Sequence, residues 1–324
     1  MDKLRSFPPQ EPAHPEGFLH HRWRGKCYPP FIDRRATAYL SESWDTQPND
    51  VLIATHQKVG THLAKKFLVE LIRACGDLAE HHPLAPGDIG HGAVPWPEVL
   101  LSQRGEAAWQ AFLAASGEQP RLWYSHCAIE DLPCRRLHPA SRFVLVLRDP
   151  RAVAVSQYFF WRRHPLLGVD PSLDLERFCA LFSGGDLYFG DYFRHVLGWL
   201  DPEPLIDPEQ LCVLRYEDLV NEKPASLERL RSFLFPDRPL SAAAAAAIVA
   251  STEFTTMKRQ LSANPGSFHF DPDVFFRAGR CDNWRQHLSA RAEALIMAAC
   301  RRSWAGHAHH PVLAPYLTDA AAPC

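Results

Sequence analysis

The segment from His56 to His62 has the residue types and the spacing of an anion-binding loop. It follows an apolar run, Val51 to Ala54, and precedes a segment with helical periodicity. Backbone N–H groups at the start of such a helix lack intrahelical acceptors, and the helix dipole adds positive potential there. Lys58 contributes a mobile cation and Thr61 a hydroxyl. This combination predicts a binding site for a phosphate group of a cofactor or substrate.

A second basic segment, Arg148 to Arg151, follows the most apolar stretch of the chain, Phe143 to Leu147. Arg148 would lie at the carboxyl end of a central strand, where open α/β sheets bind their ligands. Ser156 follows about two helical turns later, so its hydroxyl and the Arg148 guanidinium are able to bind the same phosphate. Taken alone, Arg148 is also compatible with an ordinary ion pair at a sheet edge. A third basic segment places Arg277 and Arg280 around Gly279 in a predicted loop.

The elements that would position these segments alternate along the chain. Apolar runs predict strands at residues 51–56, 121–126, 142–147 and 211–214. Periodic apolar residues predict helices at 63–75, 107–115, 150–160, 174–200, 224–235, 241–250 and 290–304. Residues 80–97 and 262–282 are predicted to be loops. Strands alternating with helices indicate an α/β fold with a central parallel sheet and helices on both faces.

The chain is predicted to form one domain. Residues 1–45 form an extended lead-in that packs on the domain, residues 46–305 form the domain itself, and residues 306–324 form a C-terminal tail. The 324 residues are 46% hydrophobic, which is ample for a core of this size.

The composition argues against several classes of partner. The net charge of −2 excludes a global basic field, so we expect neither nucleic acid nor an anionic membrane as partner. No apolar run approaches about 18 residues, and the N-terminus lacks the apolar core of a secretory signal. The nine cysteines and 17 histidines form no metal-ligand pattern. These features predict a cytoplasmic protein without a metal.

In their order and content, the basic segments resemble the cytosolic sulfotransferase family, which uses 3′-phosphoadenosine 5′-phosphosulfate (PAPS). Thr55–Leu63 is similar to the family's 5′-phosphosulfate loop, usually read TYPKSGTTW. Val144–Ser156 resembles its 3′-phosphate segment, and Phe276–Arg285 resembles its RKGxxGDWK loop. Arg215–Leu219 is similar to its YEDL stretch. The matches run in family order from about residue 44 to 288, which covers most of the chain.

The resemblance implies a P-loop-like fold, PAPS as cosubstrate and 3′,5′-adenosine bisphosphate as product. It implies that Lys58 stabilises the leaving phosphate, that Arg148, Ser156 and Arg277 bind the 3′-phosphate, and that Tyr216, Thr252 and Phe254 frame the adenine. The full set of implied cofactor-binding residues is Lys58, Val59, Gly60, Thr61, His62, Leu63, Arg148, Ser156, Tyr216, Thr252, Phe254, Phe276, Arg277, Ala278 and Gly279.

His126 is the candidate general base, and Lys58 is the second candidate catalytic residue. His126 lies in Tyr124–Cys127, after a predicted strand, where the family reads Lys-Thr-His. Without the other motifs, a core histidine at a strand end would be the simpler interpretation. The candidate acceptor pocket is aromatic and comprises Phe18, Trp96, Tyr124 and Phe160. Such a pocket suits a small hydrophobic or aromatic molecule that offers a hydroxyl or an amine.

Several residues depart from the family pattern. Tyr124 stands where the family has a lysine, His62 replaces a threonine, Leu63 replaces a tryptophan and Ala278 replaces a lysine. These changes leave open a second hypothesis, a catalytically impaired nucleotide-binding or sensing protein with the same fold. A third, a P-loop small-molecule kinase, has little support because the loop lacks the glycine and lysine spacing of a Walker A motif. The tail shows no dimerisation segment, and the oligomeric state stays open.

Overall fold

We analysed a computed structural model, in which residues 14–79, 82–84, 94–263, 272–277 and 279–317 are described. Its main sheet has four parallel strands in the order β4-β3-β5-β6. The strands are β3 (Asp50–Thr55), β4 (Arg121–Ser125), β5 (Arg142–Leu147) and β6 (Leu211–Arg215). A separate antiparallel pair is formed by β1 (His21–Trp23) and β2 (Lys26–Tyr28). The predicted α/β class with a central parallel sheet is confirmed.

The helices before and between the strands are α1 (Arg34–Ser43), α2 (Thr61–Cys75), α3 (Pro97–Ser116), η2 (Ile129–Asp131), α4 (Pro150–Arg163), α5 (Leu175–Gly184), α6 (Tyr192–Leu200) and η3 (Pro208–Gln210). Those after β6 are α7 (Tyr216–Asn221), α8 (Lys223–Leu234), α9 (Ala242–Ser251), α10 (Phe254–Ala263), α11 (Pro272–Phe275), η5 (Asn283–Gln286), α12 (Ala290–Trp304), η6 (Ala305–His307) and α13 (Ala314–Leu317).

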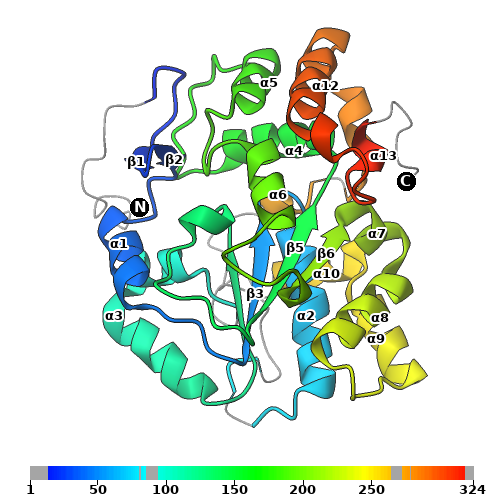
Figure 1. The fold of residues 1–324 in the computed structure, drawn as a ribbon. Coiled ribbons are helices and arrows are strands. Elements are labelled where there is room, and N and C mark those ends of the chain that lie inside the picture. The colour runs from blue at the N-terminus through cyan, green and yellow to red at the C-terminus, as the bar shows by residue number, and fades with distance from the viewer. Residues whose placement is uncertain (1–13, 80–81, 85–93, 264–271, 278, 318–324) are drawn as a thin grey trace.

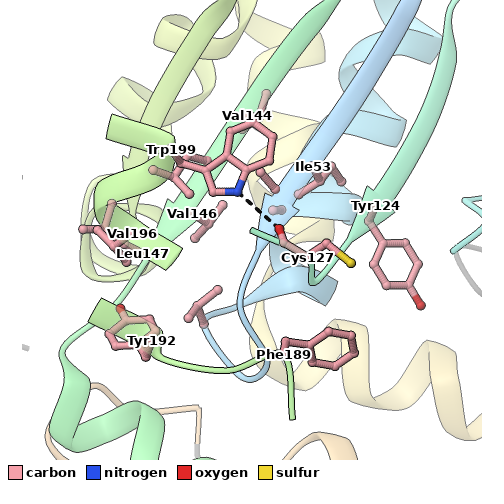
Figure 2. Close-up of a cluster of buried hydrophobic side chains, with 14 of the residues drawn as sticks. Ile53, Tyr124, Cys127, Val144, Val146, Leu147, Phe189, Tyr192, Val196 and Trp199 are labelled. Atoms are coloured by element: carbon pink, nitrogen blue, oxygen red, sulfur yellow. Dashed lines mark hydrogen bonds between the residues drawn. The ribbon is translucent and has the colours of Figure 1, made fainter. Parts of the chain in front are cut away.

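Both faces of the sheet are covered by helices. α2 packs on β3 and β4 and contacts α8 and α9, whereas α6 packs with α12, which also contacts α4 and α5 (Figure 1). Figure 2 shows Val196 and Trp199 of α6 against Val144 and Val146 of β5, all of them buried. The Trp199 indole N–H donates to the Cys127 carbonyl at 3.3 Å, which ties α6 to the segment after β4.

The register brings the predicted motifs to one edge of the sheet. Ala54 pairs with Ser125, Thr55 with Val146, and Leu147 with Arg215. The carboxyl ends of all four strands therefore lie together. Because parallel strands present their following loops at this edge, the segments after β3, β4, β5 and β6 converge there.

Four predictions for the elements need correction. The helix predicted at residues 174–200 is two helices, α5 and α6, which are separated by residues 185–191. The lead-in is not wholly extended, since α1 occupies residues 34–43, capped by the Asp33 carboxylate, which accepts from the Arg35 N–H. α3 begins at Pro97 rather than at residue 107, and its backbone breaks at Gly105. α11 lies inside the predicted loop of residues 262–282. Within the described residues, no helix combines the length and the apolar character of a membrane span.

Candidate active site

The loop between β3 and α2 adopts the conformation that an anion cradle requires. Gly60 has a φ of 113° and precedes the first residue of α2, and no side chain caps this helix start. Lys58 also lies in the left-handed region, with a φ of 67°. A non-glycine residue in this region costs of order 1–3 kcal/mol and persists only where its surroundings enforce it. Because Gly60 has no side chain, it cannot cap the first N–H groups of α2, as is usual at helix starts that bind anions.

Arg148, which follows β5, and two residues of α4 form hydrogen bonds with the loop between β3 and α2. The Gln157 amide donates to the Gln57 carbonyl at 3.1 Å, and the Trp161 indole donates to the Gln57 side chain at 3.1 Å. The Arg148 guanidinium donates to the Lys58 carbonyl at 3.1 Å. These three hydrogen bonds fix the Gln57 and Lys58 segment of the loop against α4 and Arg148.

Three cations from separate segments converge beside this loop. Burial, then the charges of Arg148 and Arg277, lower the pKa of Lys58 to about 7. Burial, then Arg148 and Arg163, lower the pKa of Arg277. Arg148 also donates to the Arg280 carbonyl at 3.1 Å, while its buried Nε has no hydrogen-bond partner among the described residues. The charged forms of these side chains repel one another, and a bound anion would relieve that repulsion.

Tyr216 and Gly60 are in direct contact. The Arg148 guanidinium stacks on the Tyr216 ring, with 4.1 Å between the guanidinium carbon and the ring centroid. A Cβ on Gly60 would approach Tyr216 Cδ2 to 2.5 Å. Glycine is therefore required here for its φ and also for the close approach.

An apolar cluster lies beyond the start of α2. Leu63, Phe254 and Phe276 pack there with Met257 and Leu261. The Phe254 and Phe276 rings are 5.7 Å apart and meet edge to face. A Cβ on Gly279 would approach Phe254 Cδ2 to 2.5 Å, so the third basic segment closes onto this cluster. A planar apolar group such as a purine base suits these surroundings.

His126 follows β4 and is buried, with 8% of its surface exposed. Its Nδ1 lies 2.8 Å from the Thr55 carbonyl oxygen, which only accepts hydrogen bonds. Nδ1 therefore carries the proton, and Nε2 is left with its lone pair. Burial is the main cause that lowers the pKa of His126, to about 3. His126 is neutral at physiological pH and able to accept a proton.

An aromatic cage surrounds His126. Its ring centroid lies 4.7 Å from Trp96, 5.4 Å from Phe189 and 5.7 Å from Tyr124. Phe160 approaches from α4, where its ring lies 4.3 Å from Lys58 Nζ. Phe160 is connected to Trp96 of the cage through His164 and Phe31. The arrangement places a group of cations next to aromatic rings that surround a neutral imidazole.

The comparisons with known proteins assign the family. The model of the sulfotransferase domain matches residues 48–307, which is most of the chain. The chain belongs to the sulfotransferase domain family. It is 27% identical to human Sulfotransferase 2B1 over 295 residues, which is 89% of this chain and 75% of that protein. It is 29% identical to Sulfotransferase 6B1 of Danio rerio over 269 residues, covering 83% of each.

Two solved structures show the same fold. The mouse sulfotransferase SULT7A1, crystallised with PAP, matches with a TM-score of 0.70 at 20% identity, over 92% of this chain and 98% of that one. Retinol dehydratase in complex with androsterone and the inactive cofactor PAP matches with a TM-score of 0.64 at 18% identity, over 90% of each chain. The P-loop-like fold of the sulfotransferases, predicted from the motifs, is therefore confirmed.

The structure brings most of the predicted site residues to one edge of the sheet, but five need separate mention. Phe18 is fully buried against Trp161 and Tyr188, outside the aromatic cage. Thr61 donates its hydroxyl to Thr55 at 3.1 Å, and Thr252 donates to the Val249 carbonyl at 2.7 Å. Ser156 is partly exposed on α4. Ala278 lies outside the described residues.

Other residues near the site were not predicted from the sequence. Phe31, His164 and Phe189 extend the aromatic cage, and each comes from a segment without a recognisable motif. Glu98 is fully buried and accepts from the Ser125 hydroxyl at 2.7 Å. Its position in the Trp-Pro-Glu stretch at the start of α3 was the only signal in the sequence.

Proposed function

We propose that this protein transfers the sulfuryl group of PAPS to a hydroxyl or amine of a small hydrophobic or aromatic acceptor. The observation that carries the proposal is the convergence of Lys58, Arg148 and Arg277 beside a neutral His126 in an aromatic cage. The solved relatives crystallised with PAP support PAPS as the donor. When bound, PAPS supplies an activated sulfur and a phosphate leaving group.

The residues suit the donor's two anionic ends. The N–H groups at Gly60, Thr61 and His62 would bind the 5′-phosphate, and Lys58 would neutralise it. Arg148, Ser156 and Arg277 would bind the 3′-phosphate. Within the described residues Arg148 Nε has no hydrogen-bond partner, and Arg148 and Arg277 repel each other. A doubly anionic ligand would satisfy both features.

The proposed reaction moves one proton to the base and replaces one bond at sulfur with another. The acceptor hydroxyl would give its proton to His126 Nε2 while its oxygen forms the new bond to sulfur. The bond from sulfur to the 5′-phosphate oxygen breaks, and its electron pair stays on that oxygen. Lys58 would stabilise the negative charge that develops there, which favours the transition state over the ground state.

The aromatic cage indicates the class of acceptor. Phe31, Trp96, Phe160 and Phe189 present aromatic rings around His126 and Lys58. Aromatic surroundings of this kind would favour a phenol or a polycyclic alcohol over a sugar. Retinol dehydratase, which shares the fold, was crystallised with androsterone, a ligand of this kind.

The first test is calorimetry with 3′,5′-adenosine bisphosphate and with ATP, followed by transfer from PAPS to a panel of phenols and alcohols. We expect the bisphosphate alone to bind tightly, and at least one phenol or alcohol to be sulfated. Preference for ATP with a requirement for Mg²⁺ would favour the kinase hypothesis. Bisphosphate binding without transfer to any acceptor would favour the sensing protein.

A further inference from the structure

Thr55 is a buried threonine whose hydroxyl lies between the start of α2 and the candidate base. It is the last residue of β3, and none of its surface is exposed. Its Oγ1 accepts a hydrogen bond from the Thr61 hydroxyl at 3.1 Å. The same Oγ1 lies 3.2 Å from His126 Nδ1. Thr61 is the first residue of α2 and is also buried, so the three side chains form a buried hydrogen-bonded chain.

The carbonyl and the hydroxyl of Thr55 have different roles toward His126. The carbonyl oxygen lies 2.8 Å from Nδ1 and only accepts, so it fixes the tautomer of the ring. The hydroxyl oxygen, at 3.2 Å, is the second and weaker acceptor for the same Nδ1–H. Since this oxygen also accepts from Thr61, it uses both of its lone pairs, and its own hydrogen takes no part in the chain.

We infer that Thr55 is a positioning residue that links the 5′-phosphate of the donor to the general base, through the Thr61 hydroxyl on one side and His126 Nδ1–H on the other. The inference rests on the proposed function, in which the 5′-phosphate binds at the start of α2. The Thr61 hydroxyl then donates to the phosphate, because a charged acceptor forms the stronger hydrogen bond. The Thr55 hydroxyl in turn donates to Thr61 Oγ1, and its oxygen keeps only the bond from Nδ1–H.

This rearrangement turns all three donors in one direction, from the imidazole to the phosphate. Hydrogen bonds in such a chain polarise one another, so the bond from Nδ1–H to Thr55 becomes stronger. No proton is transferred along the chain, and each hydrogen stays on its own heavy atom. In the transfer step the imidazole gains a proton at Nε2, while the 5′-phosphate oxygen gains the electron pair of the broken bond. The chain joins these two developing charges and therefore stabilises the transition state more than the ground state.

Thr37 shows what a buried threonine hydroxyl does when it serves only its own helix. It lies on α1, is as fully buried as Thr55, and donates to the Asp33 carbonyl four residues earlier at 3.3 Å. The Thr55 hydroxyl instead connects the start of α2 with the residue that follows β4. Thr37 therefore provides a matched control for the loss of a buried hydroxyl.

The test is NMR of the full-length protein labelled with ¹⁵N-histidine, without ligand and with saturating 3′,5′-adenosine bisphosphate. The Nδ1–H resonance of His126 is assigned with His126→Ala. In the wild type we expect this resonance to move downfield when the bisphosphate binds, because its hydrogen bond strengthens. Thr55→Val keeps the side-chain shape and the carbonyl, so the resonance should persist and the downfield shift should be lost. Thr55→Ser restores the hydroxyl and should recover the shift.

Thr37→Val should show the same downfield shift as the wild type. A shift in Thr55→Val as large as that of the wild type would overturn the inference, as would the absence of a shift in the wild type at saturation. If Thr55→Val does not fold, Thr61→Val breaks the chain at its other end and is measured in the same way, with the same outcomes.

Turnover provides the second readout and separates this inference from the proposed function. With PAPS and a phenol as acceptor, Thr55→Val should lower kcat about 10-fold and leave the KM of the acceptor within about twofold, and Thr55→Ser should recover most of kcat. An unchanged kcat in Thr55→Val would refute the role of Thr55 and leave the proposed function intact. A Thr55-dependent shift in a protein that sulfates no acceptor would refute the proposed function and support the link. Absence of bisphosphate binding by the wild type would refute both.

Discussion

Binding of the bisphosphate should depend on pH through Lys58. Burial, and then the charges of Arg148 and Arg277, lower the pKa of this lysine to about 7 in the free protein. A phosphate placed against the ammonium favours the charged form, so binding raises the pKa and takes up a proton. The free protein then binds best below pH 7, where Lys58 is already charged. Affinity falls as the pH rises through that value.

The size of the effect follows from the pKa. Between pH 7 and pH 9 the charged fraction of free Lys58 falls from about one half to about one hundredth, so the dissociation constant should rise about 50-fold, or about 2.3 kcal/mol. Both phosphates have lost their second protons in this range, since that pKa is near 6. The ligand itself therefore adds little to the pH dependence.

The assay is isothermal titration calorimetry at pH 7, 8 and 9, in two buffers of different ionisation enthalpy. We expect proton uptake of about one half at pH 7 and close to one at pH 9. Lys58→Met should bind more weakly at pH 7 and show no pH dependence. A dissociation constant for the wild type that stays constant from pH 7 to pH 9, with no proton uptake, would refute the reasoning.

Three further predictions concern the frame of the site. Gly60→Ala introduces a Cβ at 2.5 Å from Tyr216 at a φ of 113°, so urea denaturation should show a loss of about 1–3 kcal/mol, whereas Gly184→Ala, which meets nothing within 4 Å, should be close to neutral. Arg148→Lys keeps the charge but loses the donor fork that spans the Lys58 and Arg280 carbonyls. Calorimetry should then show bisphosphate binding weakened about 10- to 100-fold, and equal affinity would contradict the assignment. Tyr316→Phe removes the hydroxyl that donates to the buried Glu217 carboxylate, which also accepts from the Asp149 N–H. The free energy of unfolding from urea denaturation should fall by about 1–3 kcal/mol. An unchanged urea midpoint would show that this contact is weak.

The sheet could be predicted from the sequence because its strands are almost entirely apolar. The bounds of β5 at residues 142–147 and of α12 at residues 290–304 match the prediction, since each segment has one clear periodicity. The 34–43 helix was missed because its buried stripe consists only of Ala36, Thr37 and Leu40. The Asp33 cap ahead of that stripe was the available signal.

Only those site residues that lie in recognisable motifs could be predicted from the sequence. Lys58, Arg148 and Arg277 could be grouped because each lies in a recognisable segment at the carboxyl edge of the sheet. The chain from Thr61 through Thr55 to His126 could not be predicted, since it depends on how the loop after β3 returns Thr61 to the end of that strand. The placement of Phe18 in a separate aromatic cluster likewise depends on how the chain before β1 folds back.

The roles of individual residues stay predictions, as do the domain bounds at residues 46 and 305 and the cytoplasmic location. Among the roles, that of His126 bears most directly on catalysis. Its Nδ1 is held by the Thr55 carbonyl, which leaves Nε2 as the only ring atom able to take a proton.

The most direct test is transfer of ³⁵S-labelled sulfuryl from PAPS to a phenol or alcohol acceptor by the wild type and by His126→Ala. Calorimetry with 3′,5′-adenosine bisphosphate is run on both proteins in parallel. We predict that the substitution lowers turnover by about 10²- to 10⁴-fold and leaves the bisphosphate affinity within about twofold. Unchanged turnover in His126→Ala, or absence of transfer by the wild type with every acceptor, would contradict the account.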